Sequence, residues 1–164
     1  MSETKRETKL KVLFAASECL PFVKTGGLAD VAGSLPAALA AQGADVAVVL
    51  PLYQKVKEKF SDQLHFECYD YVDLAWRHSY CGLFSLEKDG VTWYFLDNEQ
   101  YFNRPELYGY MDDGERFGFF SRAVVRMLPH LRFWPEVIHC NDWQTALVPI
   151  YLLEERHRIP QLCD

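Results

Sequence analysis

The stretch Lys24-Thr25-Gly26-Gly27 places a cation beside two glycines, a combination that suits an anionic ligand. It follows an apolar run at residues 12–16 and leads into a segment with helical apolar spacing. Strand, glycine turn and helix is the order that opens a nucleotide-binding βαβ unit. Glycines permit positive φ and close approach of a ligand, and the first amides of a helix have no internal partner. We predict an anion site here. The alternative is an ordinary strand-to-helix turn, since a Gly-Gly pair alone is not specific.

A second polar group lies where another short apolar run ends. His139, Asn141 and Asp142 stand between this predicted strand and a predicted helix. Ligands of open α/β sheets bind at that edge, and histidine and amide side chains can hydrogen-bond a hydroxyl group. The alternatives are a buried histidine bonded to the backbone and an aspartate that only caps the helix.

A third group lies in a long polar segment at residues 97–114, which the sequence predicts to be a loop. Loops of this length without secondary structure are uncommon unless they have a function. Tyr101, Arg104 and Tyr108 offer aromatic faces and a guanidinium, which suit the apolar faces and the hydroxyls of sugar rings. The alternative is that these side chains only anchor the loop.

The elements that position these groups predict a parallel α/β sheet. Strands are expected at 11–16 and 45–50, joined by a helix that begins near Gly27, contains Pro36 and ends at Gln42-Gly43. A short return of this kind implies a right-handed crossover and parallel strands.

The middle of the chain predicts antiparallel strands inserted within one domain. The expected strands are 64–76, 79–87 and 91–96, with Arg77-His78 dividing the first two and a hairpin turn at Asp89-Gly90. A helix capped by Asp112-Asp113 should bury one face, a strand is expected at 136–139, and Asp142 should cap a helix over 143–157 that Pro149 interrupts. The expected core face consists of Phe117, Phe120, Val124, Met127 and Leu128.

Composition narrows the class of protein. The chain has 164 residues, 49% of them hydrophobic, which is enough for one domain with a real core. A net charge of -6 disfavours nucleic acid or an anionic membrane as partner. The five cysteines are odd in number and widely spaced, which favours reduced thiols in the cytoplasm over a disulfide framework. We expect no metal site and no membrane span, and a disordered polar leader at residues 1–10.

Residues 11–31, KVLFAASECLPFVKTGGLADV, resemble the amino terminus of bacterial glycogen synthases and plant starch synthases. The similarity continues in the same order through residues 35–39, 49–53, 104–109 and 137–143. The resemblance implies a retaining glucosyltransferase that moves glucose from ADP-glucose to an α-1,4-glucan without metal or cofactor. It also implies a GT-B fold, in which two Rossmann-like domains face each other across a cleft.

The resemblance assigns roles to three sets of residues in this chain. Lys24, Thr25, Gly26, Gly27 and Asp30 are expected to bind the donor. His139, Asn141 and Asp142 are the expected catalytic residues. On the acceptor side, the expected residues are Tyr101, Arg104, Tyr108 and Asp112.

The chain departs from the family pattern at two positions. The family usually has a second histidine where this chain has Asn141, which cannot take a charge, and an asparagine where it has Asp113. Residues 11–164 are expected to form an incomplete amino-terminal domain without the nucleotide-binding second domain, so that this chain alone would be inactive. Truncation, a frameshift or a fragment would each explain the ending. The alternative function is a non-catalytic sugar- or nucleotide-binding module, or a remnant of the synthase.

Overall fold

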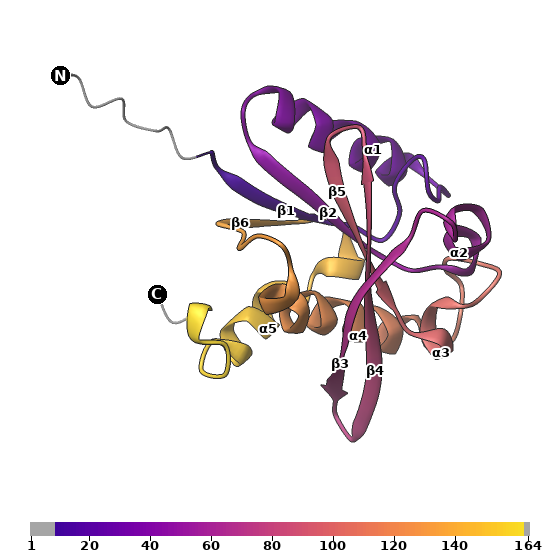
Figure 1. The fold of residues 1–164 in the computed structure, drawn as a ribbon. Coiled ribbons are helices and arrows are strands. Elements are labelled where there is room, and N and C mark those ends of the chain that lie inside the picture. The colour runs from indigo at the N-terminus through magenta and orange to yellow at the C-terminus, as the bar shows by residue number, and fades with distance from the viewer. Residues whose placement is uncertain (1–8, 163–164) are drawn as a thin grey trace.

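The computed structural model describes residues 9–162, which form one mixed sheet with helices on both faces (Figure 1). Within this range the strand order is β3-β4-β5-β2-β1-β6. The strands are β1 (Lys11–Ala15), β2 (Asp45–Pro51), β3 (His65–Leu74), β4 (Arg77–Lys88), β5 (Val91–Asp97) and β6 (Val137–Cys140). The helices are α1 (Gly27–Ala41), α2 (Gln54–Phe60), α3 (Glu99–Phe102), α4 (Asp113–Met127) and α5 (Val148–Glu155), with short 3-10 turns η1 (Leu128–His130), η2 (Trp143–Thr145) and η3 (Pro160–Leu162).

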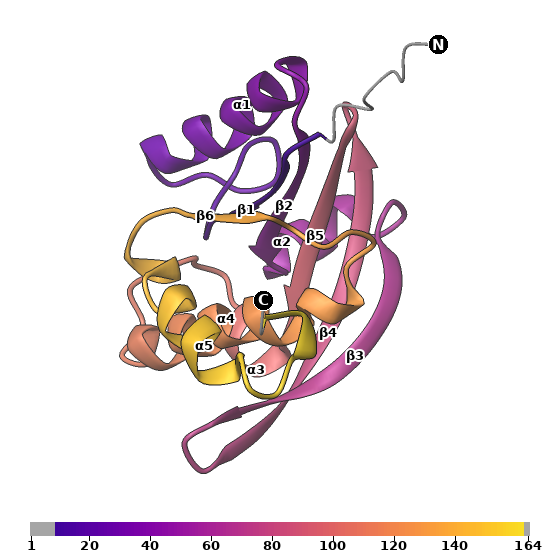
Figure 2. The same ribbon diagram turned by 90° about the vertical axis from the view of Figure 1, so that its left-hand side faces the viewer.

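The parallel half of the sheet consists of β5, β2, β1 and β6. Its strands are continuous apolar runs because both faces are covered. Figure 2 shows α1 on one side of these strands and α4 with α5 on the other. Phe14 of β1 pairs with Val48 of β2 and with His139 of β6, and it is fully buried. The predicted parallel α/β sheet is therefore confirmed.

The antiparallel half is the meander β3-β4-β5. Asp89 and Gly90 both have positive φ, 54° and 75°, as a tight hairpin turn requires, so the predicted turn is confirmed. The predicted division at Arg77-His78 is wrong, because both residues belong to β4 and the turn lies at Ala75, with φ 51°. β5 also pairs with β2 in parallel, so this strand joins the two halves and is not merely inserted.

The connections diverge between β1 and β6. From β1 the chain passes through α1 to β2, whereas from β5 it passes through α4 on the other face to β6. In open α/β sheets ligands bind outside the carboxyl ends of the strands at such a switch point. The fold therefore places its natural ligand site at the ends of β1 and β6.

Several helical segments differ from the predictions. The helix α2 was not expected, because of its seven residues only Val56 is buried and its pattern is mostly charged. The predicted loop at 97–114 contains α3. The predicted helix over 143–157 is divided into η2 and α5, since Pro149 lies in the first turn of α5, where its missing N–H costs nothing.

Aromatic side chains pack against one another in the core. Phe22 contacts Phe60, Trp93 and Phe95, each with a ring-centroid distance of 5.0 Å. All five residues of the predicted core face of α4 are buried, which confirms that face: Phe117, Phe120, Val124, Met127 and Leu128.

The four cysteines within residues 9–162 are free thiols. Burial raises the pKa of Cys19 to about 12, so this thiol stays protonated and unreactive at neutral pH. Residues 1–8 of the predicted leader and Cys163 lie outside the described residues.

Candidate functional site

The three polar groups predicted separately meet at the carboxyl end of β1. The backbone N–H and the side-chain Nδ2 of Asn141 donate to the carbonyl oxygen of Ala15, at 3.1 and 3.0 Å. The Ser17 hydroxyl lies 2.8 Å from the Tyr108 hydroxyl. Glu18 bonds to Thr25 in the glycine turn. The strand end at the switch point thus contacts the glycine turn, the end of β6 and the long loop.

The carboxylate of Glu18 holds the glycine turn from inside the protein. Glu18 is 3% exposed, and its Oε2 accepts hydrogen bonds from the backbone N–H of Thr25 and, at 3.3 Å, from that of Gly26. It also accepts from the Thr25 hydroxyl at 2.8 Å. Two amides that the sequence offered to a ligand are therefore already bonded to a carboxylate of the chain itself. An incoming anion is left with the amides at the start of α1, beginning with that of Gly27, and with Lys24.

Of the two uses that the sequence suggested for these glycines, positive φ is not adopted. Gly26 has φ -143°, and Gly27 is not among the described residues with positive φ, so close approach of a ligand is the use that stays a prediction. A Cβ added at Gly27 would meet nothing within 4 Å. By contrast, a Cβ at Gly33 would lie 2.9 Å from the carbonyl oxygen of Leu20, so α1 needs that glycine to pack closely. The open space at Gly27 is available to a ligand.

Lys24 and Asp30, both predicted to bind the donor, form an ion pair with each other. The Lys24 Nζ lies 2.6 and 2.8 Å from the two carboxylate oxygens of Asp30. The side chains are 45% and 54% exposed, so water screens the pair and it is weak. A phosphate could take the place of the Asp30 carboxylate at small cost.

At the end of β6, His139 is exposed and its ring stacks on Phe14, with centroids 4.8 Å apart. This excludes the alternative of a buried histidine. The Asn141 side-chain nitrogen lies 3.1 Å from His139 Nδ1 and donates to the His139 carbonyl at 3.0 Å. Asn141 thus links the imidazole to the end of β1 and fixes the ring beside the switch point.

Asp142 has φ 63° and ψ 180°, a region that a non-glycine residue adopts only under strain. Its carboxylate accepts from the backbone N–H of Trp143 at 2.7 Å, which confirms the predicted cap. Strained backbone of this kind clusters at functional sites. The strain therefore adds to the case for this edge of the sheet.

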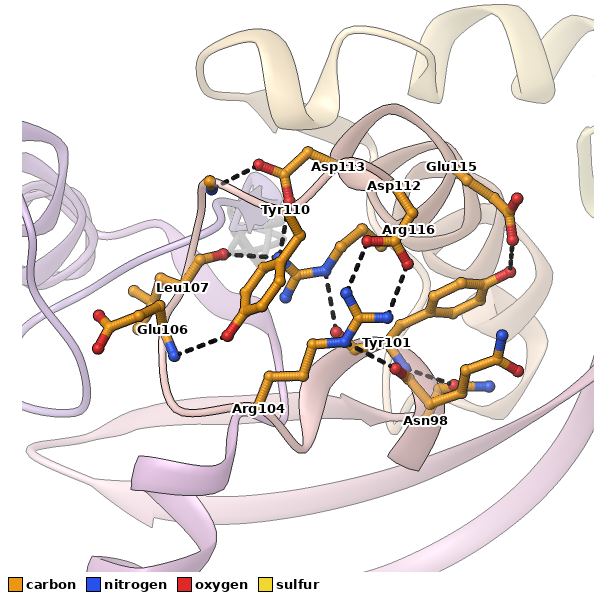
Figure 3. A network of polar contacts seen from close by, with 12 residues as sticks. Asn98, Tyr101, Arg104, Glu106, Leu107, Tyr110, Asp112, Asp113, Glu115 and Arg116 are labelled. Carbon is orange, nitrogen blue, oxygen red and sulfur yellow. Dashed lines mark hydrogen bonds and ion pairs between the residues drawn. The ribbon is translucent and has the colours of Figure 1, made fainter.

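A buried arginine that the sequence analysis did not single out organises the long loop (Figure 3). Arg116 is 0% exposed and donates to the carbonyl oxygens of Tyr101 and Leu107, at 2.9 Å each. It also pairs with Asp113 at 2.9 Å, and Asp113 accepts from the Gly109 N–H at 2.8 Å. The loop is thus tied to α4 through its own backbone.

Arg104 and Asp112, both predicted to bind the acceptor, form a two-pronged ion pair with both N–O distances 2.6 Å (Figure 3). The hydrogen bonds from Arg104 lower the pKa of Asp112. Because its carboxylate is engaged, Asp112 makes no side-chain cap to α4, and that prediction is wrong.

Tyr101 is buried, and its hydroxyl donates to Glu115 at 2.5 Å. It anchors the loop and offers no surface to a sugar in this structure. Tyr108 is half-buried beside Ser17, and burial raises its pKa to about 12, so its hydroxyl is neutral and can donate or accept a hydrogen bond.

Ser17, Glu18 and Arg116 are the site residues that sequence reasoning missed. One available signal was a carboxylate placed directly after a buried strand, and another was an arginine one turn after Asp113 within an apolar helix. Among residues 9–162 there is no group of three metal-ligating side chains that could hold an ion. No helix in the same range is long and apolar enough to cross a membrane.

Comparison with known proteins places these observations in a family. The profile described as "Starch synthase catalytic domain" matches residues 11–163. A glycogen synthase of Lactococcus lactis is 57% identical over 151 residues, covering 90% of this chain and 31% of the relative. A glycogen synthase of Lactobacillus acidophilus is 52% identical over 147 residues, again covering 90% of this chain and 31% of the relative.

The fold is similar to a solved plant structure. The catalytic domain of starch synthase IV from Arabidopsis thaliana, bound to ADP and acarbose, superimposes with a TM-score of 0.69 at 30% sequence identity. The match covers 88% of this chain and 30% of that one. The chain therefore spans about a third of the length of the relatives it matches.

Proposed function

Because the chain belongs to the starch synthase catalytic domain family, we propose that it supplies the acceptor-side part of a glucosyltransferase active site. The reaction is transfer of glucose from ADP-glucose to the non-reducing end of an α-1,4-glucan, with retention of configuration. The observation that carries this proposal is the meeting of three segments at the end of β1, where Ala15, Ser17 and Glu18 each bond to one of them.

On the donor side, Lys24 and the Gly27 amide bind the diphosphate of ADP-glucose. Lys24 exchanges its exposed partner Asp30 for a phosphate oxygen, and the amino-terminal end of α1 adds its dipole. His139 and Asn141 bind hydroxyls of the donor glucose. Asn141 contributes hydrogen bonds only, since an amide carries no charge.

On the acceptor side, the Tyr108 hydroxyl is the group closest to the strand end. The Arg104–Asp112 pair positions the loop that carries it, and Tyr101 anchors that loop from the core. The proposed transfer needs no metal or cofactor.

Residues 1–164 by themselves should show no measurable transfer. Transfer requires the departing diphosphate and the acceptor to be held together, and positioning of this kind is worth several kcal/mol. One exposed lysine and the amides at the start of α1 cannot neutralise a diphosphate.

A chimera tests the proposal directly. Residues 11–162 replace the matching segment of the Lactococcus lactis glycogen synthase, and transfer from labelled ADP-glucose to glycogen is measured. We expect activity within about tenfold of the parent, because the segments are 57% identical. A folded chimera without transfer would contradict the proposal.

Asn141 provides an internal check within that chimera. Asn141→His should retain transfer, because both side chains can hydrogen-bond a hydroxyl. Asn141→Leu should lose about 5- to 150-fold, because it leaves polar partners unpaired at a cost of about 1–3 kcal/mol. Equal activity of the Leu variant and the parent chimera would remove this position from the site.

A second candidate is a binding module without catalysis. It is favoured by the hydrogen bonds that two amides of the glycine turn donate to Glu18, because these bonds leave fewer amide donors for a phosphate. Calorimetry separates the two. Binding of maltoheptaose by an inactive, folded chimera, without binding of ADP-glucose, would support the module.

A further inference from the structure

The outer face of the β3–β4 hairpin carries exposed aromatic side chains far from the end of β1. The hairpin extends past the rest of the fold (Figures 1 and 2). Tyr69 is 57% exposed, Tyr71 43% and Phe66 47%. We call this surface the aromatic hairpin face; it consists of Phe66, Tyr69, Tyr71, His78, Tyr80 and Phe84.

The strand register places these rings on one face of the sheet. Tyr71 lies opposite Tyr80, and Tyr69 lies opposite Gly82, so that the side chains form two adjacent stacks. Tyr71 stacks on His78 with centroids 4.6 Å apart, and Tyr69 stacks on Tyr80 at 5.7 Å. Each stack buries one side of its rings and leaves the outer ring surfaces open.

The aromatic hairpin face continues into a hollow of about 320 Å³. Phe84 belongs to both, and Gly82 pairs with Asp97 at the edge of the hollow. The hollow is lined by both apolar and charged residues, which are Leu52, Lys57, Ser61, Leu64, Phe84, Asp97 and Glu99. Together they form an elongated surface that runs from α2 along the hairpin.

The charges on this surface are already paired with one another. His78 Nδ1 lies 2.6 Å from Asp73, and Lys57 lies 2.8 Å from Asp97 and also contacts Glu99. The net charge of -6 would repel a polyanion, and the carboxylates on this surface already have partners. The surface is therefore complementary to a neutral partner.

The exposed apolar groups also favour a particular partner. On β3 all of them are aromatic, whereas on α5 the exposed ones are aliphatic, Ile150 and Leu153. Aliphatic groups suit any apolar surface. Aromatic faces beside hydroxyls suit a ligand with one apolar face and a polar edge, which describes a sugar ring.

We propose that the aromatic hairpin face binds a linear α-glucan chain at a site separate from the end of β1. β3 and β1 are four strand positions apart in the sheet, or about 19 Å at the usual strand spacing. The choice of an α-linked glucan rests on the proposed function. A glucan held here and at the end of β1 at once would be retained between successive transfers.

Maltoheptaose titrated into the 164-residue chain, followed by NMR of the backbone amides, tests the proposal. We expect shifts in β3 and β4, and about tenfold weaker binding in a Tyr69→Ala/Tyr71→Ala variant. Leu153→Ala removes an apolar group elsewhere that is more exposed than either tyrosine, and this variant should bind as the parent does. Thermal melts of all variants establish that each one is folded.

Three outcomes would overturn the proposal. The first is binding by the folded double variant within twofold of the parent. The second is equal binding of cellopentaose, a β-linked glucan, which would contradict the α-glucan class. The third is a concentration-dependent dimer that the double variant abolishes, which would make the face a self-association surface. These binding measurements need no ADP-glucose, so their result is independent of the transfer assay. An inactive chimera would contradict the proposed function alone, and loss of binding at the hairpin would contradict this proposal alone.

Discussion

The two loops that flank the end of β1 are held by opposite charges. In the glycine turn, the buried carboxylate of Glu18 accepts hydrogen bonds from backbone N–H groups. In the loop before α4, the buried guanidinium of Arg116 donates to backbone carbonyls. The Tyr101 carbonyl belongs to the last turn of the short helix α3 and the other backbone groups lie outside helices and strands, so they need partners from side chains. The buried side chains of Glu18 and Arg116 provide these hydrogen-bond partners.

The two loops differ in how firmly they are held. Arg116 is inaccessible and bonds to Tyr101 in α3, to Leu107 in the loop and to Asp113 at the start of α4, whereas the turn that Glu18 holds has an exposed lysine and open space at Gly27. The loop before α4 is therefore held rigidly, whereas the glycine turn has room to rearrange around a ligand. The following predictions test this difference, from the largest expected effect to the smallest.

Arg116→Met should destabilise the fold by about 3–5 kcal/mol, because it leaves two buried carbonyls and the Asp113 carboxylate without their partner. Urea unfolding measures the loss. Arg132→Met is the matched control, because Arg132 is 52% exposed and its ion pair should contribute within about 1 kcal/mol. Similar stabilities of the two variants would mean that Arg116 does not hold the loop before α4.

Lys24→Ala should lower the catalytic efficiency of the active chimera by about 10- to 150-fold, since a hydrogen bond to a charged phosphate contributes about 1.5–3 kcal/mol. The melting temperature should stay unchanged, because the side chain is half exposed. Lys88→Ala, at a lysine of similar exposure at the end of β4, should have no effect on transfer. A Lys24 variant with catalytic efficiency within twofold of the parent would contradict an anion site at the glycine turn.

Glu18→Ala should release the glycine turn, at a cost of about 1–3 kcal/mol for the unpaired amides. Trypsin should then cut after Lys24 faster than in the parent, with the fragment identified by its mass. Glu18→Gln keeps an oxygen that can accept from these amides, so its cleavage rate should lie near that of the parent. If Ala and Gln variants were cut equally fast, the charge rather than the geometry of Glu18 would hold the turn.

Asp112→Asn should remove part of the acid sensitivity of the loop. The hydrogen bonds from Arg104 lower the pKa of Asp112 in the folded state, so the pair stabilises the fold above the unfolded pKa. This stabilisation is lost as the pH falls through the lowered folded pKa. The stability difference between parent and variant should therefore shrink as the pH falls from about 5 through the ordinary aspartate pKa and then through the lowered pKa of the folded state. A difference that is constant with pH would show that the pair contributes little.

Sequence patterns predicted the regular elements better than the groups that hold the loops. The continuous apolar run of β1 and the Asp89-Gly90 turn follow from local rules, and both predictions are confirmed. The helix α2 was not predicted, because six of its seven residues are not buried and it therefore shows no apolar helical pattern.

The roles of Glu18 and Arg116 could not be predicted in the same way. Their partners are backbone groups 7 to 15 residues away along the chain, and the path of the intervening loop, rather than spacing alone, brings them together. The same holds for Lys24 and Asp30, whose ion pair depends on how the turn enters α1. Positions of site residues were thus more predictable than their partners.

The order of the strands has a consequence for how the protein is made. β1 leaves the ribosome well before β6, one of its two neighbours in the sheet, and the bond from Asn141 to Ala15 spans 126 residues. At a synthesis rate of about 5–20 residues per second, that edge of β1 stays unpaired for on the order of ten seconds. Nascent chains stalled at increasing lengths should gain protease resistance at β1 only after residue 141 has emerged. Earlier resistance would mean that β1 and β2 are stable as a pair, and that the ligand site is added to a finished structure.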